Sequence, residues 1–416
     1  MSGSAFYSTG GSSYGRFMDL HVHGLTGDNL NASDVMLYNG TSDNIVAFGR
    51  LEGGRSTGVY MQLDSTRNKV LFNQISDQNA YGILDYDNDP RITSSLILGN
   101  TVRDITGSDA IEGRLVFGAG IYTADTGGQI IAFNDLSGCN QVTVDETLAP
   151  GGIGQNAIHS PMSALVLGNV SRENHWYGYM SIIATKPIAW IGNLAHENAK
   201  DQFYAKNADH PLIALNIAYS VESEAERSIS VNAAETGVHR GAVLLGNRTL
   251  GGTLRAIELQ KTELSNVVGN NASDIGAEAV AHWLAGSSYM AHVGNVIDAA
   301  DSSNYAMLIS DCTYSTFGSN MIRIAEGTSI AVQINGDCTN SFFDKSNIIA
   351  GKPEPMNFIN NDSPGCIVET FGSGPPTLLR HQVGDRVWNR SAASGSPDFW
   401  RCTTAGAPGI WVASNL

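Results

Sequence analysis

A short apolar run that ends in asparagine recurs along the chain, and this repeat constrains the fold more than any other feature. Leu96–Asn100 (LILGN) and Leu165–Asn169 (LVLGN) typify the run, in which the asparagine usually follows a glycine. Successive asparagines are 27, 34, 35, 24, 23, 31, 23, 25 and 25 residues apart. A unit of about 24 residues cannot bury a core alone and must stack on its neighbours. The clear copies end at Asn73, Asn100, Asn134, Asn169, Asn193, Asn216, Asn247, Asn270, Asn295 and Asn320.

A second apolar segment precedes each copy by about nine residues, as in Gly58–Asp64 (GVYMQLD) and Tyr81–Asp87. Each unit is therefore expected to run strand, turn, strand, turn, without helical periodicity. Equivalent strands of stacked units would lie about 4.8 Å apart. The asparagine fits this arrangement, because stacked Asn side chains hydrogen-bond in ladders and Asn tolerates left-handed turn geometry.

These features predict an all-β fold, a right-handed parallel β-helix of about 11–13 rungs with a small C-terminal β module. A β-propeller is the alternative, but its blades need about 40 residues. We expect a linker or truncated stub over residues 1–20, the β-helix over 21–350, a Gly/Pro-marked linker over 351–380 and the C-terminal module over 381–416. The longer repeat steps predict insertions, which in solenoids often project from the binding face.

The composition supports this prediction and excludes several classes of function. The 416 residues include 46 Gly, 34 Asn and only 7 Lys, which disfavours an all-helical protein. A net charge of −16 argues against nucleic acid as a partner, because phosphate binding needs a basic face. No apolar run is long enough to span a membrane. The five cysteines are widely spaced without a CxxC pair, so we expect free thiols, no metal site and no cofactor.

The C-terminal residues carry a resemblance to a known group of proteins. Val383–Asn389 (VGDRVWN) and Trp400–Trp411 (WRCTTAGAPGIW) resemble a short module that recurs in bacteriophage tail-spike and tail-fibre proteins and in related β-helical carbohydrate-processing proteins. Trp388, Trp400 and Trp411 lie in this module. They would either stack on sugar rings or form the core of a module too small to fold without docking.

The resemblance implies a phage tail spike with the architecture of a polysaccharide depolymerase (pectate-lyase-like). Such spikes are usually homotrimers that bind, and often cleave, the capsule or the lipopolysaccharide O-antigen of the host. It also implies a location in the virion tail after assembly in the host cytoplasm, and contacts with other tail proteins. An N-terminal virion anchor is usual in that group, and here the first rung is expected to begin within about 20–40 residues of the start of the sequence.

Hydrolysis of a polysaccharide needs two carboxylates, about 5 Å apart for retention and about 6.5–9.5 Å apart for inversion. Adjacent rungs of a β-helix supply such spacings directly. The repeat places Asp64, Asp87 and Asp125 at equivalent strand ends, so we expect one acidic column, with Asp85 on the same face as Asp87. The alternative is ordinary turn chemistry, since Asp is a common turn residue. Further candidates are the acid Glu112 and, to hold an acidic sugar, Arg91 and Arg114.

A second group of candidates follows the insertion over residues 138–160. Lyase chemistry on uronic acids needs a Tyr, His or Lys as base, which His175 and Tyr177 could provide. His21 and His23 alternate on one face but lack a third ligand for a metal. The full group comprises His159, Glu173, His175, Trp176, Tyr177, Glu197 and Asp201.

The sequence thus predicts a tail-spike depolymerase, an endo-acting glycosidase on a bacterial surface polysaccharide. The alternatives are a non-catalytic receptor-binding spike with the same scaffold, and a β-helical polysaccharide lyase.

Overall fold

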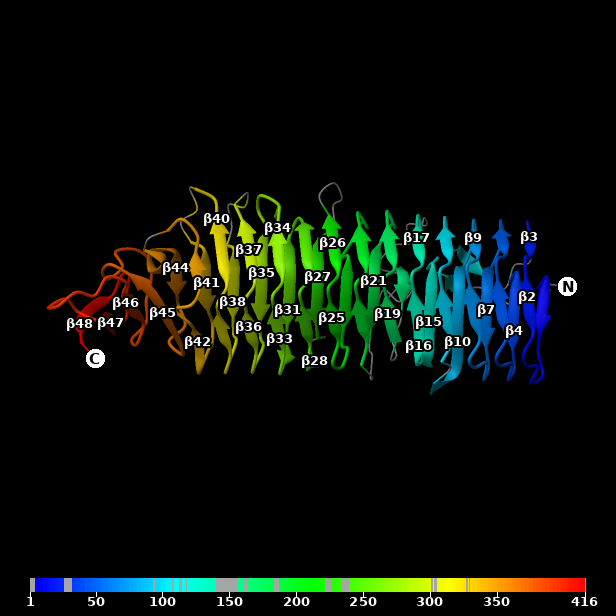
Figure 1. The fold of residues 1–416 in the computed structure, drawn as a ribbon, viewed down its shortest axis with the longest axis horizontal. Helices are drawn as coiled ribbons and strands as arrows, with labels where there is room; N and C mark the ends of the chain where they lie inside the picture. The colour runs from blue at the N-terminus through cyan, green and yellow to red at the C-terminus, as the bar shows by residue number, and fades with distance from the viewer. Residues whose placement is uncertain are drawn as a thin grey trace. The chain divides into compact units, whose positions relative to one another are not determined.

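The chain folds into β-strands with one short 3-10 helix, Pro355–Phe358, among the residues that the structure describes. The computed structural model describes residues 4–25, 32–92, 94–106, 108–111, 114–116, 118–139, 156–159, 164–182, 187–220, 226–233, 239–300, 302, 305–326, 328, 330–352 and 354–415. The chain divides into two compact units, Met1–Ala225 and Glu226–Leu416, and each is a stack of parallel rungs (Figure 1).

The first unit contains three parallel sheets, each built from one strand per rung. The first sheet has β1 (Phe6–Ser8), β4 (Val35–Tyr38), β7 (Thr57–Gln62), β10 (Tyr81–Ile92), β15 (Ile121–Gly127), β18 (Asn156–His159), β21 (Tyr177–Ile182) and β24 (Phe203–Lys206). The second has β2 (Arg16–Met18), β5 (Ile45–Ala47), β8 (Lys69–Leu71), β11 (Leu96–Leu98), β16 (Gln129–Ala132), β19 (Ala164–Leu167), β22 (Ala189–Ile191) and β25 (Leu212–Ala214). The third has β3 (His21–His23), β6 (Arg50–Glu52), β9 (Gln74–Ser76), β12 (Thr101–Arg103), β17 (Asp135–Ser137), β20 (Val170–Arg172), β23 (Leu194–His196) and β26 (Ile217–Ser220).

The second unit repeats this plan. Its first sheet has β27 (Arg227–Asn232), β31 (Arg255–Gln260), β35 (Val280–Ala285), β38 (Met307–Ser310), β41 (Val332–Asn335) and β44 (Ile359–Asn361). Its second has β29 (Val243–Leu245), β33 (Asn266–Val268), β36 (Ala291–Val293), β39 (Thr316–Gly318), β42 (Ser341–Phe343) and β45 (Cys366–Gly372). Its third has β30 (Arg248–Gly251), β34 (Asn271–Ser273), β37 (Val296–Ala299), β40 (Met321–Ile324) and β43 (Ile348–Ile349).

Short strand pairs and the C-terminal strands complete the elements. β13 (Ser108–Ile111) pairs antiparallel with β14 (Arg114–Val116) in the first unit. In the second unit β28 (His239–Arg240) pairs with β32 (Thr262–Glu263). β46 (Arg386–Asn389) pairs parallel with β45, and β47 (Phe399–Thr404) and β48 (Ile410–Ser414) extend it antiparallel.

The parallel β-helix that the repeat predicts is confirmed, but each rung has three strands where the sequence predicted two. The missed strand follows the asparagine and contains three or four residues in most rungs, such as β9 and β12. In the three-residue strands only the central residue is buried, as Ile75 and Val102 are. Alternation of one apolar residue between two polar ones is too short a pattern to separate a strand from a turn.

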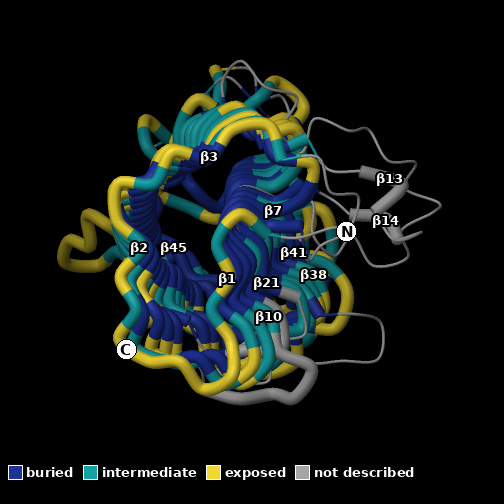
Figure 2. Tube along the Cα trace, turned by 90° about the vertical axis from the view of Figure 1, so that its right-hand side faces the viewer, coloured by how far each residue is buried: buried dark blue, intermediate teal, exposed yellow. Residues whose placement is uncertain are grey.

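Alternate side chains of the first sheet fill the interior of the first unit, which is dark blue in Figure 2. Val59, Ile83 and Ile121 are register partners with no exposed surface. Two rungs further, the rings of Tyr179 and Phe203 stack with centroids 4.7 Å apart. Burying side chains of this size contributes about 1.5–3 kcal/mol each.

An asparagine ladder runs along the corner between the second and third sheets. In the first unit Nδ2 of Asn134 donates to Oδ1 of Asn169 at 2.9 Å, and Nδ2 of Asn169 donates to Oδ1 of Asn193 at 3.0 Å. The residue before each asparagine has a positive φ, 67° at Gly99 and 54° at Phe72. This left-handed conformation explains why glycine so often precedes the asparagine.

The strands extend beyond the boundaries that the sequence suggests for the β-helix. β1 and β2 lie within residues 1–20, where a linker or stub was expected. The three-residue β44 and the seven-residue β45 lie within residues 351–380, where the surrounding Gly and Pro suggested a linker. All five cysteines are buried and free. No helix among the described residues is long and apolar enough to cross a membrane.

A buried carboxylate joins the C-terminal strands to the last rung. Asp385, from the VGDRVWN motif, accepts hydrogen bonds from the main-chain N–H groups of Val368 and Gln382, both at 2.9 Å. Nδ2 of Asn361 donates to both of its oxygens. Burial raises the pKa of Asp385 to about 7, although these donors oppose the shift. The motif therefore contributes to structure through its aspartate.

Candidate functional site

An aromatic row crosses the outer face of the first sheet in the first unit. Tyr60, Tyr122 and Tyr204 belong to it, and their neighbours along the strands face the interior. Side chains alternate between the two faces of a strand, so these tyrosines lie on the opposite face. We call this the tyrosine row, and its register partners are Met36, Tyr60, Leu84, Tyr122, His159, Met180 and Tyr204.

At one end of the tyrosine row the aromatic rings pack into a cluster outside the solenoid. Tyr60 and Leu84 are only 3% exposed, because half-buried tyrosines cover them. The rings of Tyr81 and Tyr122 lie 5.2 Å apart. The covering tyrosines are Tyr38, Tyr81, Tyr86 and Tyr122. A surface of this kind presents flat apolar rings with polar hydroxyl groups at their rims.

At the other end Trp176 and Tyr177, both predicted from the sequence, come together with residues that the sequence reasoning missed. Tyr177 stacks on Tyr204, with ring centroids 4.9 Å apart and an interplanar angle of 13°. Trp176 meets Tyr177 edge-on at 6.0 Å, and the Lys200 ammonium lies 4.4 Å from the Trp176 ring centre. All three rings are half-buried. Tyr204 could have been predicted only from the register between β21 and β24, which depends on the length of the loop between them.

Asp85 does not lie on this outer face. It is 1% exposed, and its register partners Met61 and Thr123 are buried in the interior. Nε2 of Gln129 donates to its Oδ2 at 3.2 Å. The prediction of Asp85 as a catalytic carboxylate is therefore corrected: it is an internal polar group, because alternation along β10 turns it inward.

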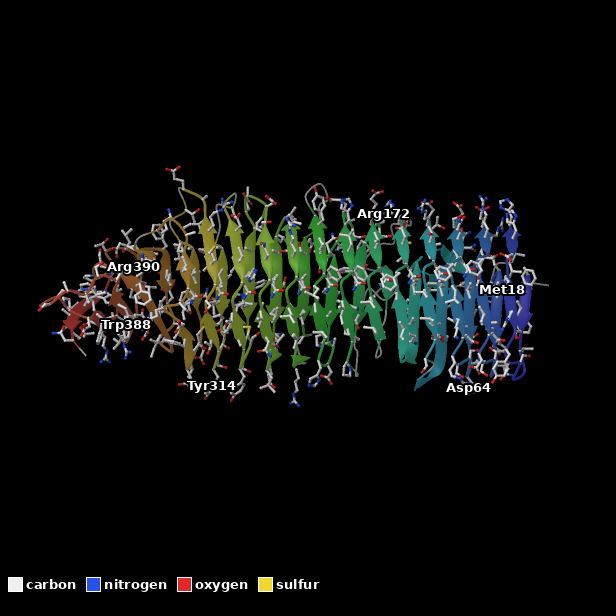
Figure 3. All side chains as sticks on the ribbon, in the orientation of Figure 1. Met18, Asp64, Arg172, Tyr314, Trp388 and Arg390 are labelled. Carbon is white, nitrogen blue, oxygen red and sulfur yellow. The ribbon has the colours of Figure 1, made fainter. Side chains whose placement is uncertain are left out.

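The other acidic candidates lie at the strand ends. Asp64 is exposed in the turn after β7, with φ 60°, and projects at the lower edge of the ribbon in Figure 3. The registers pair Met61 with Asp85 and Asp85 with Thr123. Asp64 comes three residues after Met61 in the chain. Asp87 comes two residues after Asp85, and Asp125 two residues after Thr123, so Asp64 is offset by one residue from the other two. The register between β10 and β15 shifts after Tyr86.

Several predicted residues lie where only the main chain is described, or outside the described residues. The side chains of Asp87, Asp125, Arg91, Arg114 and His159 belong to the first group, although His159 has its place in the tyrosine row. Glu112 belongs to the second.

The remaining members of the second predicted group spread over separate surfaces. His175 and Glu173 are exposed in the turn between β20 and β21. Glu197 is half-buried with φ 50°, and Asp201 is fully buried. His21 and His23 both lie 3.9 Å from Glu52. No group of three His, Cys, Asp or Glu with a metal-binding arrangement occurs among the described residues.

The C-terminal tryptophans have separate environments in the second unit. Nε1 of Trp388 donates to Glu369 at 2.9 Å, and the ring lies 5.2 Å from Phe399. Nε1 of Trp411 donates to the Pro408 carbonyl at 3.0 Å. Trp400 is half-buried in β47. These are packing contacts, and the Lys345 ammonium lies 3.8 Å from the centre of the Trp388 ring.

The fold and this face define a parallel β-helix protein with an aromatic outer surface. No protein-family model and no curated protein match the chain. Among solved structures, the Siphovirus 9NA tailspike receptor binding domain is 9% identical with a TM-score of 0.43, covering 99% of this chain and 84% of that one. The A-module of the Azotobacter vinelandii mannuronan C-5 epimerase AlgE6 is 15% identical with a TM-score of 0.41, covering 80% and 88%.

The Dettilon tailspike protein is 12% identical with a TM-score of 0.38 and covers 78% of this chain. This chain spans 63% of that tailspike's length. The solved structures that resemble the chain are thus phage tailspikes and β-helical polysaccharide enzymes, together with an adhesin. The likeness concerns the course of the chain and not the residues of a site.

Proposed function

We propose that the protein is a tail-spike-like β-helix protein that binds a bacterial surface polysaccharide, capsule or O-antigen, along the tyrosine row. The observation that carries this proposal is the stack of Tyr177 on Tyr204 beside Trp176, half-buried on a regular sheet face. Sugar rings present apolar C–H faces, which pack on such aromatic rings. Rungs about 4.8 Å apart place Tyr60, Tyr122 and Tyr204 on the same sheet face, so that a polymer ligand can meet more than one ring. The resemblance of the C-terminal motif to tail-spike modules supports the same function.

Binding to a panel of purified capsular and O-antigen polysaccharides tests the proposal. The variant Tyr204→Ala removes one ring of the stack and is expected to weaken binding about five- to tenfold. A matched control is Tyr314→Ala, because Tyr314 also stacks on a tyrosine, Tyr289 at 5.0 Å, but belongs to the turn between β38 and β39 in the second unit (Figure 3). An equal loss in both variants, or binding to none of the polysaccharides, contradicts the proposal.

Cleavage is the second part of the proposal, with Asp64, Asp87, Asp125 and Glu112 as candidate carboxylates of an endo-glycosidase. Two of these would serve as acid and as nucleophile or base. Incubation with the bound polysaccharide should release new reducing ends. Each aspartate is changed singly to Asn, and the change at an aspartate that belongs to the catalytic pair should abolish release without weakening binding. Binding without new reducing ends identifies a receptor-binding spike, and products with an unsaturated uronide absorbance identify a lyase.

The remaining features follow from the same resemblance and are proposals too. The protein would act as a homotrimer in the virion tail, in contact with other tail proteins, after assembly in the host cytoplasm. Sedimentation of the full chain at several concentrations tests the trimer.

A further inference from the structure

A basic pocket lies in the second unit, between the last complete rung and the C-terminal strands. Its volume is about 360 Å³, within the range of ~300–1,000 Å³ for small-molecule sites. It is built from the turn between β42 and β43, β43 itself, the segment that follows β43, the end of β45 and the residue after β46. The lining residues are Lys345, Asn347, Ile348, Ile349, Gly351, Lys352, Pro355, Phe371 and Arg390.

Three cations converge on this pocket in a chain with a net charge of −16. Lys345 and Lys352 are two of only seven lysines, and Arg390 is the third cation. Within the described part of the chain, none of the three lies within 4.0 Å of a carboxylate oxygen. The nearby Asp344 and Glu354 instead accept hydrogen bonds from Ser346 and Ser373. The three positive charges are therefore available to a ligand.

The position of one of these cations is fixed by a chain of contacts. The Lys345 ammonium lies 3.8 Å from the centre of the Trp388 ring. Trp388 is held in turn by Glu369, which is 6% exposed and also accepts a hydrogen bond from Arg386 at 3.1 Å. A cation on an aromatic face gains about 0.5–1 kcal/mol at an exposed site and keeps its donors free. The pocket thus holds a pre-positioned charge.

The other wall of the pocket is apolar and open to solvent. Ile348 is 55% exposed and Phe371 is 37% exposed. Lys352 lies over a second ring, 4.7 Å from the centre of Phe358. Exposed apolar groups beside unpaired cations suit a ligand with both an apolar face and a negative charge. Figure 3 labels Trp388, which belongs to β46, and Arg390, which follows that strand.

We propose that this pocket binds one acidic sugar residue, a ring that carries a carboxylate or a phosphate. The sugar ring packs its C–H face on Ile348 and Phe371, and its anionic group meets Lys345, Lys352 and Arg390. This deepens the proposed function, on which it rests for the class of ligand, by adding a charged subsite apart from the tyrosine row. It implies that the polysaccharide is acidic, because a neutral sugar leaves the three cations without a partner.

Calorimetric titration of the full chain with D-glucuronate, glucose 6-phosphate, D-glucose and inorganic phosphate tests the proposal. One of the acidic sugars should bind at least tenfold more tightly than glucose and inorganic phosphate. Lys352→Gln and Arg390→Gln should each weaken that binding about tenfold, the value of one hydrogen bond to a charged group. Arg401→Gln, an exposed arginine of β47 that does not line the pocket, is the matched control and should leave it unchanged.

If D-glucuronate is the sugar that binds, the pocket recognises a carboxylate. If glucose 6-phosphate binds, it recognises a phosphate. Equal binding of glucose, equal binding of inorganic phosphate, or full affinity in both pocket variants overturns the proposal. The melting temperatures of the variants show that they are folded. If the chain binds a polysaccharide through Tyr204 but binds no acidic sugar, this inference fails while the proposed function stands. If Tyr204→Ala does not change polysaccharide binding but Arg390→Gln weakens acidic-sugar binding, the proposed function of the tyrosine row fails while this inference stands.

Discussion

Asn270 donates two hydrogen bonds to the same oxygen of Asn295, Oδ1, one from its main-chain nitrogen at 2.9 Å and one from Nδ2 at 3.0 Å. Nδ2 of Asn270 also donates to the Leu244 carbonyl, and its own Oδ1 accepts both donors of Asn247. Every polar atom of the amide is therefore paired although the residue has no exposed surface.

Asn270→Ala should lower the free energy of unfolding by about 2–4 kcal/mol, because it leaves buried donors of Asn247 without an acceptor. The adjacent Asn271 is exposed in β34 and provides a matched control. Chemical denaturation of both variants measures the difference. A loss below 1 kcal/mol for Asn270→Ala, or the same loss for Asn271→Ala, contradicts a stabilising role of the ladder.

Gly99→Ala should destabilise more than Gly192→Ala, although both glycines have similar positive φ values, 67° and 61°. A Cβ at Gly99 would lie 2.5 Å from the Phe72 ring, whereas a Cβ at Gly192 meets no atom within 4 Å. Gly192→Ala should lose about 1–2 kcal/mol from backbone strain alone. Thermal melts give the loss of stability in both variants. In a Phe72→Ala background, Gly99→Ala should destabilise no more than Gly192→Ala does. Equal losses in the two single variants contradict the clash.

The interior histidines of the second unit should make stability fall as the pH falls. Nδ1 of His282 lies 2.8 Å from Nε2 of His292, and both are fully buried. Burial lowers the pKa of His292 to about 3 and that of His282 well below its usual range. The other polar groups at His292 are the neutral amides of Asn295 and Asn320.

The unfolded chain binds protons at these histidines below about pH 6.5, whereas the folded chain does not. The contribution of the two histidines to the free energy of unfolding is thus complete above pH 6.5. It is lost toward lower pH, by about 1.4 kcal/mol per pH unit for each histidine. His282→Phe should make the decline in stability between pH 6.5 and 4 less steep than in the wild type. The exposed His210 gives the control His210→Gln, and identical slopes in all three proteins refute the assignment.

Asp385→Ala should release the C-terminal strands from the last rung. It removes the acceptor of two main-chain N–H groups and of the Asn361 amide, which are all buried. The expected loss is about 3 kcal/mol or more. Tryptophan fluorescence reports it, because Trp388, Trp400 and Trp411 lie in these strands. An unchanged unfolding curve, matching that of Arg401→Ala, contradicts the role of Asp385.

The repeat of asparagines was sufficient to predict the solenoid, because one interaction, the ladder, requires one residue type at one spacing. The third strand could not be predicted, since Gln74–Ser76 buries one side chain and resembles a turn. The same reason applies to the three-residue β44, whereas the seven-residue β45 was missed because the Gly and Pro around it suggested a linker. Short strands owe their conformation to neighbouring rungs and not to their own sequence.

The site was less predictable than the fold, because it depends on register. Asp85 was expected on the same face as Asp87 in a catalytic column, but which face of a strand is inward needs the strand's first inward residue to be known. Alternation from the buried Ile83 turns Asp85 into the interior. Trp176 and Tyr177 were identified by residue type, but Tyr204 was missed, since its partnership with Tyr177 crosses 27 residues of chain. The basic pocket joins segments around Lys345 and Arg390, whose proximity only the fold creates.

The asparagine ladder has one more property, which concerns how such a protein can change. Asn100 and Asn134 are separated by 34 residues and Asn169 and Asn193 by 24, yet both pairs make the same 3.0 Å bond between Nδ2 and Oδ1. The ladder depends only on the asparagine at each corner and not on the number of residues between two successive asparagines. Loops that differ by ten residues can therefore be gained or exchanged between rungs without a change in the ladder. In a scaffold of this kind the corner asparagines must stay constant, whereas the loops between rungs are free to change with the ligand.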